Sequence, residues 1–242
     1  MARIILIETS TALCSTALVE DGSIVAYKES TTPRAQASLT APFVKEMLDE
    51  RGIGVRDCDA VCVSKGPGSY TGLRVGVSTA KGLCFGAGIP LIAVGTLDTL
   101  VYQAAAEGLL PPGCRYVVPM VDARRMEVYS AVFSPDGRQL TATMPVIVAP
   151  ETPLTAGDEG DAMTFGSILT EGPVLFIGDG ADKCREALAH PDAHFAQCCP
   201  KASAMLQPAL AAFDAGRFED TAYFEPFYLK EFIATVPRKK LF

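Results

Sequence analysis

Residues 64–76, with the sequence SKGPGSYTGLRVG, are the first candidate for chemistry because they hold four glycines beside a lysine and an arginine. A strand before this loop and a helix after it would present backbone amides and a helix N-terminus to an anion. The loop matches neither the Walker pattern nor the dinucleotide-binding pattern. Two interpretations stay open: Gly66 and Gly68 shape a phosphate cradle, or the glycines only allow close packing.

The spacing of the later glycines favours packing. Gly72, Gly76 and Ala80 recur every four residues, so they share one side of a helix and leave a smooth stripe that a second helix could approach. Each glycine inside a helix costs about 1 kcal/mol relative to alanine, so several on one helix need a structural reason. Ser69 or Thr71 is expected to cap this helix.

A second candidate is the hydroxyl-rich turn Glu8-Thr9-Ser10-Thr11. Its hydroxyls and amides could surround a phosphate, and a carboxylate at this place holds the metal in phosphate-transfer folds built on such a meander. A turn of this composition could equally satisfy its own backbone.

Charged residues concentrate in the later stretch VDARRMEVYS, where Asp122 and Arg124 are secondary candidates. Charges at a strand turn are usually solvated, but the Asp-x-Arg spacing could also direct a guanidinium toward a partner or a phosphate.

The sequence predicts no metal site and no catalytic residue. His190 and His194 have the i, i+4 spacing of zinc ligands, but Pro191 lies between them and no third ligand is apparent. No Ser-His-Asp or Cys-His arrangement is available, because both histidines lie in one short segment.

The first half of the chain predicts a three-strand antiparallel meander followed by alternating strands and helices. Apolar runs predict the strands, and Asp21-Gly22 marks the hairpin between the second and third. The predicted strands are residues 3–9, 13–20, 23–29, 59–65 and 90–94, and the predicted helices are residues 38–51, 71–87 and 96–107.

The second half partly repeats this order after a Pro-Pro-Gly linker at residues 111–113. Two related lobes are therefore expected. Strands are predicted at 115–122, 126–134 and 173–178, helices at 181–190 and 202–215, and only a short helix near the end of 151–170. The last helix and residues 224–230 are expected to return to the first lobe.

Composition restricts the classes of function. The chain has 242 residues, 49% of them apolar, and a net charge of −7, so it lacks the basic footprint of a nucleic-acid-binding protein. No stretch interleaves aromatic and basic residues in the manner that stacks bases. Eight cysteines without CxxC spacing predict free thiols in a reducing compartment. With no membrane span expected, a soluble cytoplasmic protein is predicted.

Several stretches together resemble the TsaB (YeaZ) family: ILIETST, CSTALVEDG, GPGSYTGLRVGVSTAKGL, GIPLIAVGTLDTL, VDARRMEVYSA and PFYLK, in that order along most of the chain. The resemblance implies an α/β, actin-like (ribonuclease-H-like) two-lobed fold with mixed sheets flanked by helices. The N-terminal lobe would comprise residues 1–110, completed by about 202–242, and the smaller lobe residues 111–201.

The family resemblance also implies a function. The chain would be a non-catalytic subunit that binds and activates TsaD in threonylcarbamoyl transfer to the adenosine beside the anticodon of tRNA (t6A modification), with TsaE in a larger complex. A homodimer could form when TsaD is absent, and contact with tRNA would be indirect. No cofactor would bind the chain alone, with ATP or ADP and magnesium expected at an interface with TsaD. The alternative is a standalone nucleotide-dependent phosphotransferase of the actin/sugar-kinase superfamily, in which GDG at 178–180 would form a second phosphate loop.

Departures from the relatives refine these expectations. TsaD has a metal-binding His-x-x-x-His where this chain has Thr96 and Leu100, and many TsaB relatives have a histidine where this chain has Gln36. The family pairs with TsaD through the first two helices of the N-terminal lobe. Carried over to this sequence, the expected interface residues are Leu39, Phe43, Met47, Leu48, Gly72, Val75, Gly76, Thr79, Ala80 and Leu83.

Overall fold

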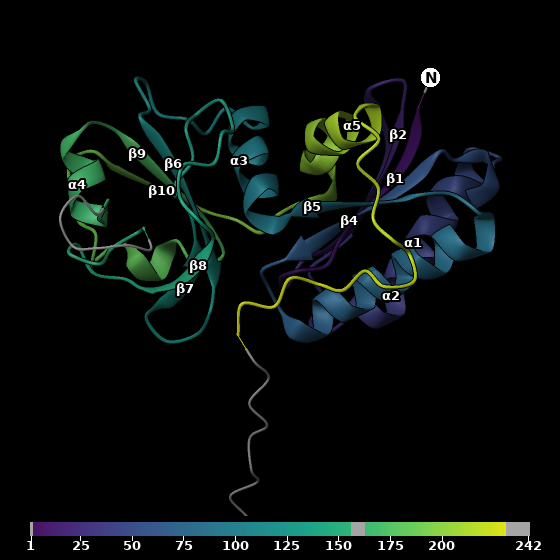
Figure 1. Cartoon of the computed structure of the whole chain (residues 1–242), viewed down its shortest axis with the longest axis horizontal. Coiled ribbons are helices and arrows are strands. Elements are labelled where there is room, and N and C mark those ends of the chain that lie inside the picture. The colour runs from purple at the N-terminus through teal and green to yellow at the C-terminus, as the bar shows by residue number, and fades with distance from the viewer. Residues whose placement is uncertain (1, 156–162, 231–242) are drawn as a thin grey trace, which may run out of the picture.

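The computed structural model describes residues 2–155 and 163–230. Figure 1 shows two mixed sheets lying side by side, each flanked by helices. This arrangement confirms the predicted two-lobed α/β fold, whereas the exact domain boundaries stay predictions.

The first sheet has the strand order β3-β2-β1-β4-β5. β1 pairs with β2 and β2 with β3 in antiparallel fashion, while β1–β4 and β4–β5 are parallel, which confirms the predicted meander. The bounds are β1 Arg3–Glu8, β2 Cys14–Glu20, β3 Ser23–Ser30, β4 Ala60–Gly66 and β5 Leu91–Gly95.

The second sheet repeats this topology with the order β10-β9-β6-β7-β8. Its three-strand meander is again antiparallel, and β6–β9 and β9–β10 are parallel. The bounds are β6 Tyr116–Asp122, β7 Glu127–Ser130, β8 Met144–Ile147, β9 Val174–Gly178 and β10 Ala193–Gln197. The internal repeat predicted from the sequence is therefore a repeat of strand order.

Helices cover both faces of the first sheet because its central strand is apolar on both sides. Helices α1 (Gln36–Glu50) and α2 (Tyr70–Ala87) pack on the face that carries Ile5 and Ile7. The 3-10 helix η3 (Ala202–Met205) and α5 (Leu206–Asp214) pack on the opposite face, with Ile4 and Leu6. Side chains alternate along a strand, so one strand serves both layers.

Helix α3 (Thr96–Ala106) lies between the two sheets in Figure 1. Its residues Leu97, Leu100 and Val101 pack against the apolar face of the second sheet. The other face of that sheet is covered by α4 (Phe165–Thr170), the short helix expected near residue 170.

The segment of residues 217–230, here called the strap, returns to the first lobe and follows α2 in Figure 1. The amide of Glu219 donates to the carbonyl of Leu91 (2.8 Å), and the amide of Phe227 donates to the carbonyl of Lys65 (2.7 Å). The ammonium of Lys81 on α2 donates to the carbonyls of residues 222 and 224. Backbone hydrogen bonds therefore fix the strap on the lobe.

The prediction of a helix at residues 181–190 is wrong. Only the 3-10 helix η2 (Asp182–Cys184) forms there, followed by turns. Pro191 cannot continue a helix, and β10 must begin at Ala193 to pair with Val174. The strand predicted at 126–134 is also shorter, with regular pairing confined to β7.

Two further expectations concern cysteines and membranes. All eight cysteines are free, as predicted, and most are buried. Among residues 2–155 and 163–230, no helix combines the length and apolar character that crossing a bilayer requires.

The glycine stripe of α2 does not form a surface for a partner. A Cβ at position 72 would overlap the carbonyl oxygen of Thr9, and a Cβ at position 76 would overlap its hydroxyl. The stripe packs against the turn after β1, inside the same lobe. Close packing of these glycines is therefore confirmed, but their neighbour is a turn of the same lobe rather than a second helix.

We predict opposite effects on stability for two glycines of this helix. Gly72→Ala should destabilise the protein by about 1–3 kcal/mol, because the added methyl group collides with backbone. Gly82→Ala is the matched control: it meets open space and should stabilise by about 0.5–1 kcal/mol through helix propensity. Urea denaturation measures both, and equal effects would contradict the packing described here.

Candidate functional site

The turn after β1 is buried rather than open. Glu8 and Thr9 have 0% exposure, Ser10 has 1% and Thr11 has 5%. The amide of Ser10 donates to Oε1 of Glu8 (2.6 Å), so the turn binds its own carboxylate. The predicted phosphate contacts therefore face protein in this structure.

Helix α2 closes this turn. The amide of Ser69 donates to the carbonyl of Ser10 (2.6 Å), and Oγ1 of Thr9 donates to the carbonyl of Gly72 (2.8 Å). Ser69 also caps the helix, as expected, by accepting from the amide of Gly72. Gly68 abuts Ser10 so closely that no side chain would fit. The interpretation of Glu8, Thr9, Ser10, Thr11 and Gly68 as an open phosphate cradle is wrong, because α2 fills the space.

Glu8 remains an unusual group within the closed turn. Its Oε2 atom, Oγ of Ser10 and Oγ1 of Thr11 are buried without a hydrogen-bond partner among the described residues. Burial raises the pKa of Glu8 to about 7, although the hydrogen bond from the amide of Ser10 opposes the rise. The carboxyl therefore changes charge near neutrality inside the core of the lobe.

A cavity of about 560 Å³ lies between the lobes. Gly66 and Lys65 at the end of β4, the start of α3, the loop of residues 139–143 and the strap form its walls. Gly66 adopts φ +106°, and a Cβ there would press on the carbonyl of Phe227, so this glycine is needed to seat the strap.

The lining of this cavity offers charged and polar groups that could bind a ligand. Its ionisable side chains are Lys65, Asp98, Glu219 and Glu225. Burial raises the pKa of Asp98, while the charge of Lys65 opposes that rise. No serine, cysteine or histidine is among its lining residues. Carboxylates outnumber the single ammonium, which disfavours the phosphates of a nucleotide at this place.

The turn after β6 carries the secondary candidates and is open to solvent. Asp122 accepts from the ammonium of Lys183 (2.5 Å) and from the amide of Arg124 (2.7 Å). Its own amide donates to Asp179, whose pKa is raised by burial. Gly180 lies directly against this turn, which explains GDG as a tight packing turn rather than as a phosphate loop. Arg124 is exposed and makes no ion pair with the described residues.

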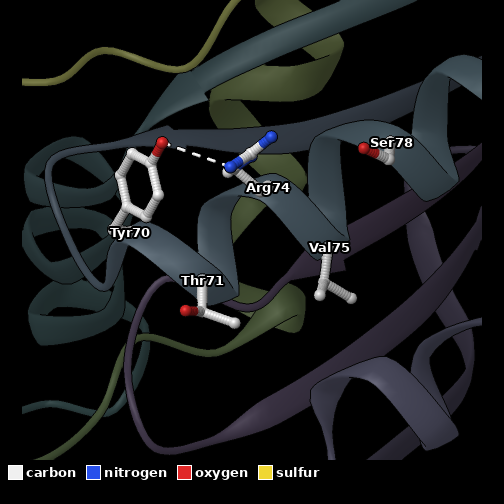
Figure 2. A pocket seen from close by; sticks show the side chains of 5 residues that line it. All are labelled: Tyr70, Thr71, Arg74, Val75 and Ser78. Carbon is white, nitrogen blue, oxygen red and sulfur yellow. Dashed lines mark hydrogen bonds between the residues drawn. The ribbon is translucent and has the colours of Figure 1, made fainter. Parts of the chain in front are cut away.

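The outward side of α2 forms a shallow hollow of about 370 Å³. Figure 2 shows Tyr70, Thr71, Arg74, Val75 and Ser78 around it, with Arg74 donating to the Tyr70 hydroxyl at 3.2 Å. Thr71, Arg74 and Ser78 are exposed, and only Val75 of the five is among the predicted interface residues.

Half of the predicted interface is not accessible. Met47, Leu48 and Ala80 have at most 3% exposure, and Gly72 and Gly76 are buried against Thr9. These residues form the apolar sides by which α1 and α2 pack on the sheet. Leu39, Phe43, Val75, Thr79 and Leu83 are half-buried, so they remain candidates. Phe85, which the sequence analysis missed, is 88% exposed.

The described residues, 2–155 and 163–230, contain no group of three potential His, Cys, Asp or Glu metal ligands. Nδ1 of His190 lies 3.7 Å from the carboxylate of Asp192 beside it in the chain. Thr96 and Leu100, which the family resemblance matches to the TsaD histidines, are fully buried, and Oγ1 of Thr96 is hydrogen-bonded to Oγ of Ser64 (3.0 Å).

Comparison with known proteins identifies the family. A family model described as TsaD, tRNA N6-adenosine threonylcarbamoyltransferase, matches residues 30–230. The tRNA threonylcarbamoyladenosine biosynthesis protein TsaB of Escherichia coli K12 is 31% identical, with 96% of each chain covered. The chain belongs to the TsaB (YeaZ) family. The TsaB of Bacillus subtilis is 34% identical over 54% of each chain.

The solved structures agree with this family assignment. A structure of YeaZ from Pseudomonas aeruginosa matches with a TM-score of 0.75 and 26% identity, covering 95% of this chain and all of that one. A second Pseudomonas aeruginosa structure, described as similar to peptidase YeaZ, gives a TM-score of 0.77 at 27% identity. The resemblance to TsaB is therefore confirmed in both sequence and fold, and it supports a role in t6A biosynthesis.

We predict that Glu8 gives this TsaB-family chain a pH-dependent stability. Its folded pKa, about 7, is above the ordinary 4.5, so the folded state binds the proton more tightly. That stabilisation is complete below about pH 4.5 and is lost as the pH rises through 7, by on the order of 3 kcal/mol. Glu8→Gln should remove this decline.

Denaturation in urea from pH 5 to 8 measures the difference between the two proteins. Glu186→Gln is the control, because Glu186 is exposed. The prediction would be contradicted if the stability of the wild type rose with pH relative to that of Glu8→Gln. That result would show that the folded protein favours the ionised carboxylate of Glu8.

Proposed function

We propose that this chain is an accessory subunit that binds and activates TsaD during t6A formation on tRNA. Relatives named as t6A biosynthesis proteins support the pathway, and one of them matches along 96% of the chain. The proposal assigns binding to this chain and the transfer reaction to TsaD.

The observation that carries the proposal is the environment of Thr96 and Leu100. These positions align with the metal-binding histidines of TsaD in the resemblance described above. Both side chains face the core, and neither a leucine side chain nor a single buried hydroxyl would replace a histidine pair as a metal site. A chain built this way depends on a partner for metal-assisted chemistry.

The proposed contact surface is formed by α1 and α2 together. These helices pack against each other on one side of the sheet, and five of their predicted interface side chains are half-buried. The surface comprises Leu39, Phe43, Val75, Thr79 and Leu83. An apolar patch of this kind can also pair with a second copy isologously, which would give a homodimer when TsaD is absent.

We propose that a nucleotide binds at the interface between this chain and TsaD. The turn of residues 8–11 is closed in the chain alone, and the interlobe cavity has more carboxylates than cations. ATP or ADP with magnesium would therefore depend on groups from TsaD. TsaE is expected to join the same complex.

The test uses the double variant Phe43→Glu with Val75→Glu. Burying two carboxylates in an apolar interface should weaken co-purification with TsaD at least about tenfold. Threonylcarbamoyl transfer to tRNA by TsaD should fall to the level measured without this chain. Ile147→Glu on β8 is the matched control, since Ile147 is 68% exposed on the other lobe.

Three results would contradict the proposal. They are full TsaD activity without this chain, unchanged association of the double variant, and equal loss of association in the Ile147 control. ATP hydrolysis by the isolated chain would instead favour the phosphotransferase alternative.

A further inference from the structure

Three segments that are distant in the sequence meet at the described end of the strap. Tyr228 of the strap packs on Tyr70 at the start of α2, with ring centroids 5.0 Å apart. The guanidinium of Arg74 lies 5.2 Å from the Tyr70 ring centroid. Two residues further along the strap, Lys230 lies 5.7 Å from the Tyr129 ring of β7 in the other lobe.

Arg124 extends this group into the turn after β6. Tyr129 pairs with Val121 in the hairpin of β6 and β7, and Arg124 lies in the turn of that hairpin. Burial raises the pKa of Tyr129, the charge of Glu127 adds to the rise, and the charges of Lys230 and Arg124 oppose it. Arg125 follows in the same exposed turn. We call this set the interlobe patch: Tyr70, Arg74, Arg124, Arg125, Tyr129, Tyr228 and Lys230.

The arginines of the interlobe patch are not neutralised within the part of the chain that is described. Lys230 pairs with Glu127, and neighbouring Lys183 pairs with Asp122. Arg74, Arg124 and Arg125 form no salt bridge with the described residues, and all three are exposed. Counting Lys183, five cations lie here beside four carboxylates, although the whole chain carries −7. The carboxylates are Asp122, Glu127, Asp179 and Glu225.

We propose that the interlobe patch binds single-stranded RNA, with its arginines on phosphates and the exposed parts of the Tyr70 and Tyr228 rings against bases. Alternating cations and aromatic rings is the arrangement by which proteins hold unpaired nucleotides. A duplex would not present its base faces to these rings. The inference relies on the proposed function only to identify the natural RNA as a tRNA anticodon loop, and it replaces the expectation of indirect contact.

The interlobe patch borders the proposed TsaD surface at one residue. Helical spacing puts Tyr70, Arg74 and Lys81 on the side of α2 that faces the strap, as the Lys81 hydrogen bonds show. Thr79 and Leu83 lie on the opposite side of the helix, whereas Val75 lines the same shallow hollow as Tyr70 and Arg74. RNA and TsaD would therefore contact neighbouring parts of the same helix that meet at Val75.

Fluorescence anisotropy of the chain alone tests the proposal. The probe is a labelled single-stranded RNA of about ten nucleotides at about 50 mM salt, compared with a duplex of the same length. Arg74→Glu with Arg124→Glu should weaken binding at least about tenfold. The slope of log affinity against log salt should become shallower by about 1.4, since each lost phosphate contact contributes about 0.7.

Arg56→Glu is the matched control, because Arg56 is exposed on the 3-10 helix η1 (Val55–Asp57) before β4 and makes no salt bridge with the described residues. It should keep nearly wild-type affinity, and thermal melts should show all variants folded. No RNA binding by the wild type, equal loss in the Arg56 variant, or preference for the duplex would overturn the proposal. Equal binding of a polyglutamate peptide would do so too. TsaD is absent, so these outcomes are separate from those of the activation test.

Discussion

The first lobe depends on the contact between the turn after β1 and the glycine side of α2. The amide of Ser69 donates to the carbonyl of Ser10, and the hydroxyl of Thr9 donates to the carbonyl of Gly72. Such an approach is possible only where no Cβ intervenes, which explains why glycine recurs every turn despite its cost in helix stability. The contact sets the direction of α2, and with it the positions of α1, the strap and every exposed side chain of this face.

The two lobes share a strand order but differ where function is concerned. In the first lobe, β4 leads into the long helix α2, which covers the turn after β1. In the second lobe, β9 leads only into the 3-10 helix η2, so the corresponding turn after β6 stays exposed. The same topology therefore buries Glu8 and leaves Asp122 and Arg124 in solvent. The difference arises from the length of one helix rather than from the turn residues.

Much of the fold was predictable because local patterns determine it. Isoleucine-rich runs and Asp21-Gly22 specify the meander, since strand burial and hairpin chirality are properties of short segments. The site was less predictable. Periodicity identified Met47 and Leu48 as the apolar side of α1, and that side faces its own sheet. A stripe of small residues on a helix indicates that another segment packs closely against it, but the stripe does not identify that segment. The interlobe patch joins Tyr70, Arg124 and Tyr228, and no linear pattern brings such distant residues together.

The packing of α5 on the first sheet has a consequence for synthesis of the chain. The face of β1 that carries Ile4 and Leu6 is covered by residues of η3 and α5, about a hundred positions after the rest of the lobe is complete. At a translation rate of about 5–20 residues per second, this face of β1 stays uncovered for roughly 5–20 s, until η3 and α5 have been synthesised. The second lobe, made from a continuous segment, can close in the meantime. The lobe that is translated first is thus the one whose core is finished last, and its uncovered apolar face is the surface that a chaperone would meet.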